Sequence, residues 1–308
     1  MDERGVSPFA GDGTWLRCAL HAHTTNSDGQ MPPEMLATHY AWAGFDVLAI
    51  TDHWVRTDVS SSDGLVMIPS TELDARVDGA AAIAHVLALG VTAEPVAPAG
   101  AFDGLDETVG WVLANGGVPY IAHPYWSGLR AEDFERCEGL VGLEVYNAGC
   151  ELEVGRGFAG MHWDDVLDGG RTFFGIAVDD SHYPGFDSSF GWVQAWCRDR
   201  SSEAVLEALR TGTFYSSAGP DIHSLTVEEA AVEIHCTPAR SVTVVAQRRA
   251  GARVNAGRLG YPLRGEILER SDEGLIVAAR LARPASPYGR VEVEDPGGRK
   301  AWTNPLWI

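Results

Sequence analysis

Histidine and carboxylate side chains recur in closely spaced runs through the first two thirds of this sequence. His21-Ala22-His23 and Asp180-Ser181-His182 each place two such side chains two residues apart, and Thr51-Asp52-His53 and Ala122-His123-Pro124 add two more imidazoles. On a strand, residues two apart face the same side, so each spaced pair would present both side chains to one space. Imidazole nitrogen together with carboxylate oxygen suits zinc, manganese or iron better than calcium.

Short apolar runs in the same region have the composition of buried parallel strands, because they are rich in Val, Ile, Leu and Phe. The predicted strands are Cys18–Thr24, Val47–Asp52, Leu65–Glu72, His85–Val91, Val118–His123, Leu140–Tyr146 and Thr172–Val178. The predicted helices are Pro33–Ala43, Leu105–Asn115, Trp163–Leu167 and Ser201–Leu209. Alternating strands and helices predict an α/β fold with a parallel sheet, here closed into a TIM-like barrel.

Most of these predicted strands bring a ligand-type side chain to, or just past, their carboxyl ends, where parallel barrels build their active sites. Taken alone, a single buried histidine is more often a hydrogen-bonded core residue than a ligand, and one HxH pair leaves the two interpretations about even. Ten histidines are present, and several of these runs occur in one chain at strand ends. Their combination favours a metal site.

The pattern changes near residue 218. Beyond it, short alternating runs punctuated by Arg, Gly and Pro are typical of antiparallel strands. These runs are Ser224–Val227, Ala231–Cys236, Ser241–Ala246, Leu275–Leu281 and Arg290–Glu294. We expect two parts, a barrel over residues 1–218 and a small antiparallel β appendage over residues 219–308.

The overall charge and the cysteines limit the possible partners. The sequence has 43 Asp and Glu against 23 Lys and Arg, a net charge of −20. Such acidity disfavours a nucleic acid polymer or an anionic membrane as the partner. No apolar stretch has the length of a membrane helix and the amino-terminus lacks a secretory signal, so we expect a cytoplasmic protein. The five cysteines form no CxxC pair, which argues against a disulfide framework or a cysteine-type zinc site.

The order of the motifs resembles that of the PHP (polymerase and histidinol phosphatase) family of metallohydrolases. The motifs are HxHT…SDG, TDH, a lone Glu, HxLxLG, AHP and DxH, and they span residues 16–217. The resemblance implies a distorted barrel of seven β/α units and up to three bound metals. It also adds His85, which begins the HxLxLG run and would otherwise pass for a core residue.

Carried over position by position, the resemblance implies nine metal ligands. The first metal would take His21, His23, Glu72 and Asp180. Glu72 would bridge to a second metal, which His85 and His123 would complete. The third would take Asp28, His53 and His182.

With metals bound, a hydroxide formed from metal-bound water would attack an electrophilic centre such as phosphorus. Glu144 and Asp52 lie beside ligands in the sequence, where they would orient the imidazoles or shuttle protons. Arg130 and Arg171 are candidates to hold a second anionic group of the substrate, although solvated surface arginines are commoner. Tyr125 and Trp126 follow His123-Pro124, and Trp54 follows His53. These aromatic residues are candidates for stacking on a substrate ring at the rim of a pocket, with packing beneath a loop the equal alternative.

A second resemblance leaves the substrate open. The run FYSSAGP at Phe214–Pro220 and the final WTNPLWI are similar to the CehA/McbA-like branch of the family, which is associated with carbamate or ester hydrolysis. The first hypothesis is therefore a phosphoesterase acting on a small, anionic or nucleotide-like molecule. The alternatives are a carbamate or carboxylic ester hydrolase with the same metals, and a metal-binding module without activity. The oligomeric state stays open.

Overall fold

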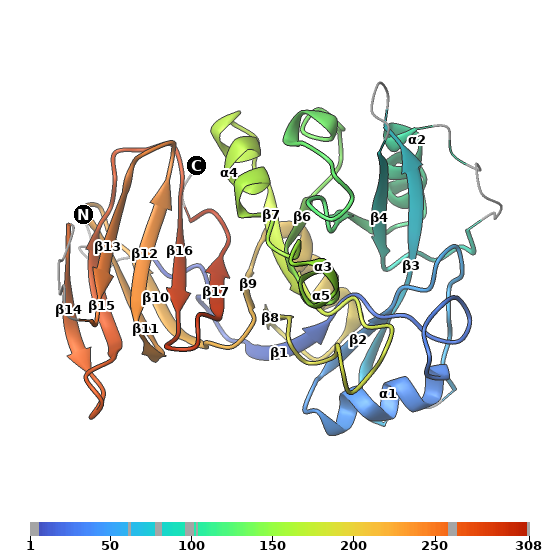
Figure 1. Ribbon diagram of the computed structural model, residues 1–308, viewed down its shortest axis with the longest axis horizontal. Helices are drawn as coiled ribbons and strands as arrows, with labels where there is room; N and C mark the ends of the chain where they lie inside the picture. Colours follow the sequence, from blue (N-terminus) through green and yellow to red (C-terminus); the bar gives the residue numbers. More distant parts are fainter. Residues whose placement is uncertain are drawn as a thin grey trace.

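Figure 1 shows a molecule built mainly of strands, with the helices gathered around the amino-terminal part of the chain. The computed structural model describes residues 6–60, 63–77, 82–95, 102, 104–257 and 264–306. The first sheet contains β1 (Thr14–Ala19), β2 (Val47–Ile50), β3 (Val66–Arg76), β4 (Ile83–Leu89), β5 (Val118–Ala122), β6 (Gly142–Asn147), β7 (Phe174–Val178), β8 (Trp192–Cys197), β9 (Phe214–Ser217), β12 (Ser241–Ala246), β13 (Gly251–Asn255), β16 (Gly289–Glu294) and β17 (Lys300–Thr303). The second contains β10 (Ile222–Val227), β11 (Ala231–Ala239), β14 (Gly265–Arg270) and β15 (Ile276–Ala282).

The first sheet is open and mixed, so the prediction of a closed (β/α)7 barrel was wrong. Its strand order within the described residues is β13-β12-β16-β17-β9-β8-β1-β2-β3-β4-β5-β6-β7. Strand β4 runs antiparallel to both β3 and β5, and β8 runs antiparallel to β1. Only residues 77–82 connect β3 to β4, too few for the crossover that parallel neighbours require. Between the edge strand β7 and β1, the described contact is the isolated bridge Ala22–Ser181.

Two of the predicted strand positions shift in a way that matters for the site. Strand β1 ends at Ala19 rather than Thr24, so His21 and His23 lie on the segment after the strand. Strand β3 runs on to Arg76, which places Glu72 within the strand rather than at its end. The four residues of β2 and the five of β5 are all buried, as expected for strands covered on both faces.

The helices have local sequence reasons for their ends. The predicted segments correspond to α1 (Pro33–Trp42), α2 (Leu105–Ala114), α4 (Gly160–Asp168) and α5 (Ser202–Thr211). The sequence analysis missed α3 (Ala148–Val154) and the 3-10 turn η1 (Ala131–Asp133). Asn147 caps α3 by accepting a hydrogen bond from Cys150 N, and Gly155 ends it with a φ of 69°. Among the described residues, no helix has the length and apolarity needed to cross a bilayer.

The carboxyl-terminal strands gather at one end of the molecule (Figure 1) and bury their own apolar cluster. The second sheet contributes Val232 and Leu281 to this cluster, and the first sheet contributes Val244 and Val291. Strand β17 pairs with β9, so the first sheet continues from the amino-terminal part into this end without interruption. The antiparallel character of these strands agrees with the predicted alternation, although β13, β14 and β17 were not foreseen. Trp307 and Ile308 of the final WTNPLWI run lie outside the described residues.

Candidate metal centre

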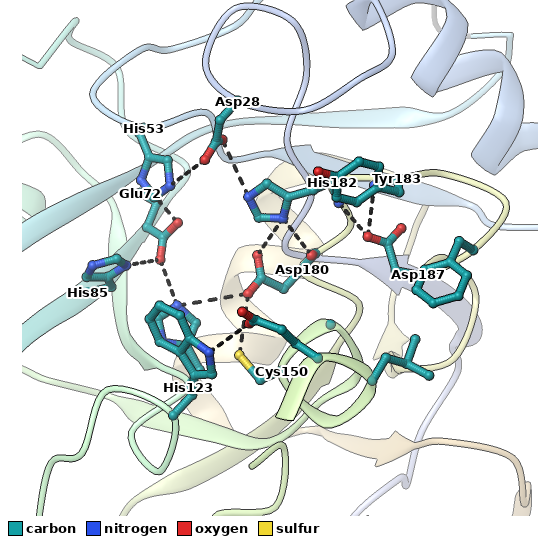
Figure 2. Close-up of a pocket in the computed structure, with 15 residues that line it drawn as sticks. Asp28, His53, Glu72, His85, His123, Cys150, Asp180, His182, Tyr183 and Asp187 are labelled. Atoms are coloured by element: carbon teal, nitrogen blue, oxygen red, sulfur yellow. Dashed lines mark hydrogen bonds and ion pairs between the residues drawn. The ribbon is translucent and has the colours of Figure 1, made fainter. Parts of the chain in front are cut away.

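Seven of the nine residues assigned as ligands line one cavity of about 390 Å³, and the other two, His21 and His23, lie within 3.3 Å of Glu72 in its lining. His21 and His23 follow β1, Glu72 and His85 come from β3 and β4, and Asp180 follows β7. Figure 2 shows the carboxylates of Glu72 and Asp180 among the imidazoles, with the carboxylate of Asp28 between His53 and His182. All nine residues assigned as ligands are therefore brought together. We call these nine residues together the floor of the cavity.

Glu72 is the centre of the floor. Its carboxylate is 1% exposed and faces five imidazoles that come from four separate segments. The distances from its two oxygens are 2.9 Å to His85 Nδ1, 3.1 Å to His123 Nε2, 3.2 Å to His21 Nε2, 3.3 Å to His23 Nε2 and 3.4 Å to His53 Nδ1. Burial alone would raise the pKa of Glu72, but the imidazoles of His21 and His85 outweigh it and hold the pKa well below its usual range.

Asp180 forms the second carboxylate of the floor. Its Oδ1 lies 3.2 Å from His21 Nε2 and 3.3 Å from His23 Nε2, and its Oδ2 accepts a hydrogen bond from Asn147 Nδ2 at 3.1 Å. Burial opposes the charged form of His23, yet hydrogen bonds to Asp180 and Glu72 raise its pKa to about 9. The same balance raises the pKa of His21 well above its usual range and lowers that of Asp180. Without a cation, protons therefore occupy imidazoles that face the carboxylates.

A more exposed group surrounds Asp28. Its carboxylate lies 3.4 Å from His182 Nε2, 3.5 Å from His23 Nδ1 and 3.6 Å from His53 Nε2. The ligand atoms of these four residues all lie within 4.8 Å of one another, as do those of His21–His23–Glu72 and those of His53–Glu72–His85. Three overlapping sets of imidazole nitrogen and carboxylate oxygen are a donor chemistry that fits divalent zinc, manganese or iron.

Glu144, on β6, contacts the floor through the ring nitrogen of His21 that does not face Glu72 and Asp180. It is fully buried, and its Oε1 lies 2.6 Å from His21 Nδ1. Its Oε2 accepts hydrogen bonds from His123 N at 2.7 Å and from Asn147 Nδ2 at 2.8 Å. A carboxylate at Nδ1 fixes the proton there and directs the Nε2 lone pair of His21 towards the cavity. Of the two roles expected from the sequence, this geometry matches orientation of a ligand.

The carboxylate of Asp52 forms no hydrogen bond or ion pair with an imidazole of the described residues, whereas the sequence suggested that it would orient one. It is fully buried and accepts hydrogen bonds from Thr24 N at 2.7 Å, Thr24 Oγ1 at 2.6 Å and Ser27 Oγ at 2.6 Å. These bonds fix the segment that carries Asp28. Gly29 closes the same segment, where a Cβ atom would lie 2.3 Å from His23 O. Asp52 therefore acts on the cavity through the position of Asp28.

Three of the residues expected to contact substrate lie away from the cavity. Arg171 donates to the backbone carbonyls of Glu135, Cys137 and Leu140, so its charge is used within the fold. Arg130 is 80% exposed beside Glu132. Tyr125 packs under the guanidinium of Arg156, 5.5 Å from its ring centre. None of the three is among the described residues that line the cavity.

Of the residues that line the upper part of the cavity, only Trp126 was a candidate from the sequence. Above the floor, the cavity is lined by Trp126, by Leu152 and Glu153 of α3, and by Tyr183 and Phe186 of the segment after β7. Asp187 fixes that segment, because its carboxylate accepts hydrogen bonds from Ser181 Oγ, His182 N and Tyr183 N. The sequence signal available for α3 was the capping Asn147 before a short run that ends at Gly155.

Comparison with known proteins finds a likeness in fold to solved structures. No family model and no curated protein matches the chain. Among solved structures, the chain is similar to a two-domain protein from Bacteroides vulgatus, described as containing a predicted PHP-like metal-dependent phosphoesterase. The TM-score is 0.53 at 15% identity, covering 99% of this chain and 100% of the other. An amidohydrolase from Chromobacterium violaceum, solved with sulfate and without metal, matches 55% of this chain and 89% of its own length at 17% identity and a TM-score of 0.42.

Proposed function

We propose that the protein is a metal-dependent hydrolase of the PHP type that cleaves phosphoesters of small molecules. The observation that carries the proposal is the position of the Glu72 carboxylate, buried among five imidazoles at the base of an open cavity. Among the described residues, no Lys or Arg forms an ion pair with Glu72, so compensation of its buried charge depends on the surrounding imidazoles or on bound cations. The full-length fold likeness to a protein described as containing a PHP-like metal-dependent phosphoesterase supports the same function.

The residues present fit up to three divalent cations, with zinc, manganese and iron as candidates. The buried set His21, His23, Glu72 and Asp180 would hold the first, with Glu72 shared towards His85 and His123, and Asp28 with His53 and His182 would hold the third. When bound, such cations acidify water and neutralise charge that develops on a phosphoryl group. Glu144 keeps His21 in the tautomer that presents Nε2 to the cavity. Asp52 and Asp187 hold the segments that bring Asp28 and His182 to it.

One observation favours a second candidate, a carbamate or carboxylic ester hydrolase. The described residues that line the cavity include neither Lys nor Arg. A phosphomonoester brings two negative charges, which the cations alone would then have to neutralise. An uncharged carbonyl substrate makes no such demand, and the same cations would activate water against carbon as readily as against phosphorus.

The experiment is a substrate panel on protein stripped of metal and reloaded with zinc, manganese or iron, with metal content measured in parallel. We expect turnover of p-nitrophenyl phosphate or bis-p-nitrophenyl phosphate that needs added metal and is lost in Glu72→Gln. Glu266→Gln makes the same change on an exposed position of β14 and should keep full turnover. Turnover of a naphthyl carbamate but of neither phosphate would replace the proposal by the second candidate. A fully loaded protein that turns over none of the three would be a metal-binding module.

A further inference from the structure

Large apolar side chains surround the mouth of the cavity. We call Trp126, Leu152, Tyr183 and Phe186, which all line it, the rim. Phe186 is 66% exposed and Tyr183 is 58% exposed. Single exposed apolar side chains are ordinary, but four around one cavity form a patch of the kind that marks a binding surface.

The rim side chains are not part of the packed interior. None of the four belongs to the apolar clusters of the described residues. Hydrogen bonds position two of the four residues: Trp126 Nε1 donates to Glu153 Oε2 at 2.9 Å, and the backbone N of Tyr183 donates to Asp187 Oδ2 at 2.8 Å. The Trp126 ring lies 5.0 Å from that of His123, so the rim adjoins the floor directly.

We propose that this site takes esters whose departing group is apolar, above all aromatic, and carries no second anionic charge. The inference rests on the proposed function and narrows its substrate class. A phosphoryl or carbonyl group held over the floor would direct its ester substituent outward, where the rim offers two aromatic rings and an indole for stacking. Substrates with a second phosphate or a carboxylate on that substituent are disfavoured.

Charge around the rim supports the second half of the proposal. The residues lining the cavity include Glu153 and Asp187 above the floor, in addition to the floor carboxylates, and no cationic Lys or Arg among those described. Arg171 donates to backbone carbonyls and Arg156 lies over the ring of Tyr125, and neither arginine lines the cavity. A second anion at the mouth would therefore face Glu153 in a chain of net charge −20.

The test measures binding of three phosphonates to metal-loaded protein by calorimetry: methylphosphonate, phenylphosphonate and 4-phosphonobenzoate. We expect phenylphosphonate to bind about tenfold more tightly than methylphosphonate, and the added carboxylate of 4-phosphonobenzoate to remove most of that gain. Phe186→Ala should weaken the binding of phenylphosphonate about fivefold, which is the range expected for the loss of one aromatic contact. The affinity for methylphosphonate should not change. Phe190→Ala is the matched control, because Phe190 lies on the same segment, is 45% exposed and does not line the cavity. Leu152→Arg should reverse the order of affinities, so that 4-phosphonobenzoate binds more tightly than phenylphosphonate.

Equal binding of the phenyl and methyl compounds would overturn the inference, as would tighter binding of 4-phosphonobenzoate to the unaltered protein. Failure of the three phosphonates to bind a protein whose metal content is complete would overturn it too. Turnover in the phosphate and carbamate panel is scored separately. Preference for the phenyl compound without turnover would refute the hydrolase and keep the ligand class, whereas turnover without that preference would refute the ligand class alone.

Discussion

The floor and the rim of the cavity are built in opposite ways. The side chains of Glu72 and His21 are almost fully buried, and each contacts groups that arrive from several strands. Phe186 and Leu152 are exposed and come from one irregular segment and one helix of seven residues. The fold fixes the floor through many partners at once, whereas the rim depends on a few local hydrogen bonds. The candidate reaction centre thus lies where the fold is most constrained, and the surface that we propose selects the substrate lies where it is least constrained.

Backbone conformation shows the same contrast. His123 and Asp180, both in the floor, have positive φ values of 27° and 54°, a region that residues other than glycine rarely occupy. Each such residue costs on the order of 1–3 kcal/mol and persists only when its surroundings hold it. Glu144 accepts from His123 N, and Asp180 N donates to His21 O at 3.0 Å. The described rim residues show no such conformation.

The largest effect should come from Glu72→Gln. The substitution keeps the shape but removes the charge that faces five imidazoles, so the floor loses both a shared ligand and its counterion. We expect metal content to fall and metal-dependent turnover to drop about 10³-fold or more. Metal analysis and kcat on the purified variant measure this. A variant that retains full metal content and turnover would show that the floor is not the reaction centre.

Metal binding by the floor should strengthen steeply with pH. His23 has a pKa raised to about 9, so below that pH a proton occupies the imidazole that a cation needs. Raising the pH from 7 to 9 removes this competition, and affinity should rise about tenfold per pH unit for each proton displaced. Calorimetry in buffers of different ionisation enthalpy counts the protons released at pH 7. Metal uptake that releases none would contradict the protonated floor described above.

Glu144→Gln should have an intermediate effect, because Glu144 holds a ligand and contacts no substrate. A glutamine cannot fix the proton on His21 Nδ1 as a carboxylate does, so the ring loses its preferred tautomer. Loss of such a partner typically lowers metal affinity or activity 10- to 100-fold. A competing chelator titration gives the affinity, and thermal unfolding of the metal-free variant reports whether folding itself suffers. Unchanged metal affinity in a folded variant would show that Glu144 does not orient His21 for metal binding.

Gly29→Ala should disturb the floor through the backbone. The new Cβ would lie 2.3 Å from His23 O and 2.7 Å from Thr24 N, so the segment carrying Asp28 must shift. We expect a loss of about 1–3 kcal/mol in stability and weaker binding of the most exposed metal. Gly110→Ala, on the exposed face of α2 where a Cβ meets nothing within 4 Å, is the control and should stabilise by up to about 1 kcal/mol. Equal stability of both variants would mean that the close approach is relieved at no cost.

The sequence predicted the floor far better than the rim. The spaced motifs identified residues such as His21 and Asp180 because their side-chain chemistry is visible without knowing the fold. Seven of the nine assigned residues line the cavity, and His21 and His23 lie within 3.3 Å of Glu72; the role of all nine as ligands stays a prediction. The direction of each strand was harder to predict, because an apolar run such as β4 has the same composition whether it pairs parallel or antiparallel. Arg130 was misplaced because neighbourhood in sequence was taken for neighbourhood in space. Of the rim, only Trp126 was a candidate from the sequence. Leu152 was missed because α3 is too short for a helical period, and Phe186 was missed because it belongs to no regular element.

The smallest effect should come from Trp126→Phe in the rim. The change keeps an aromatic ring beside His123 but removes the hydrogen bond from Nε1 to Glu153, which joins this segment to α3. Because both partners are partly exposed, the bond contributes little, and we expect less than about a threefold change in phenylphosphonate affinity and in kcat/KM. Metal content should not change at all. A large loss of turnover, or loss of metal, would mean that the hydrogen bond between Trp126 and Glu153 constrains the floor. The distinction between a rigid floor and a replaceable rim would then not hold for Trp126, where the rim adjoins the floor.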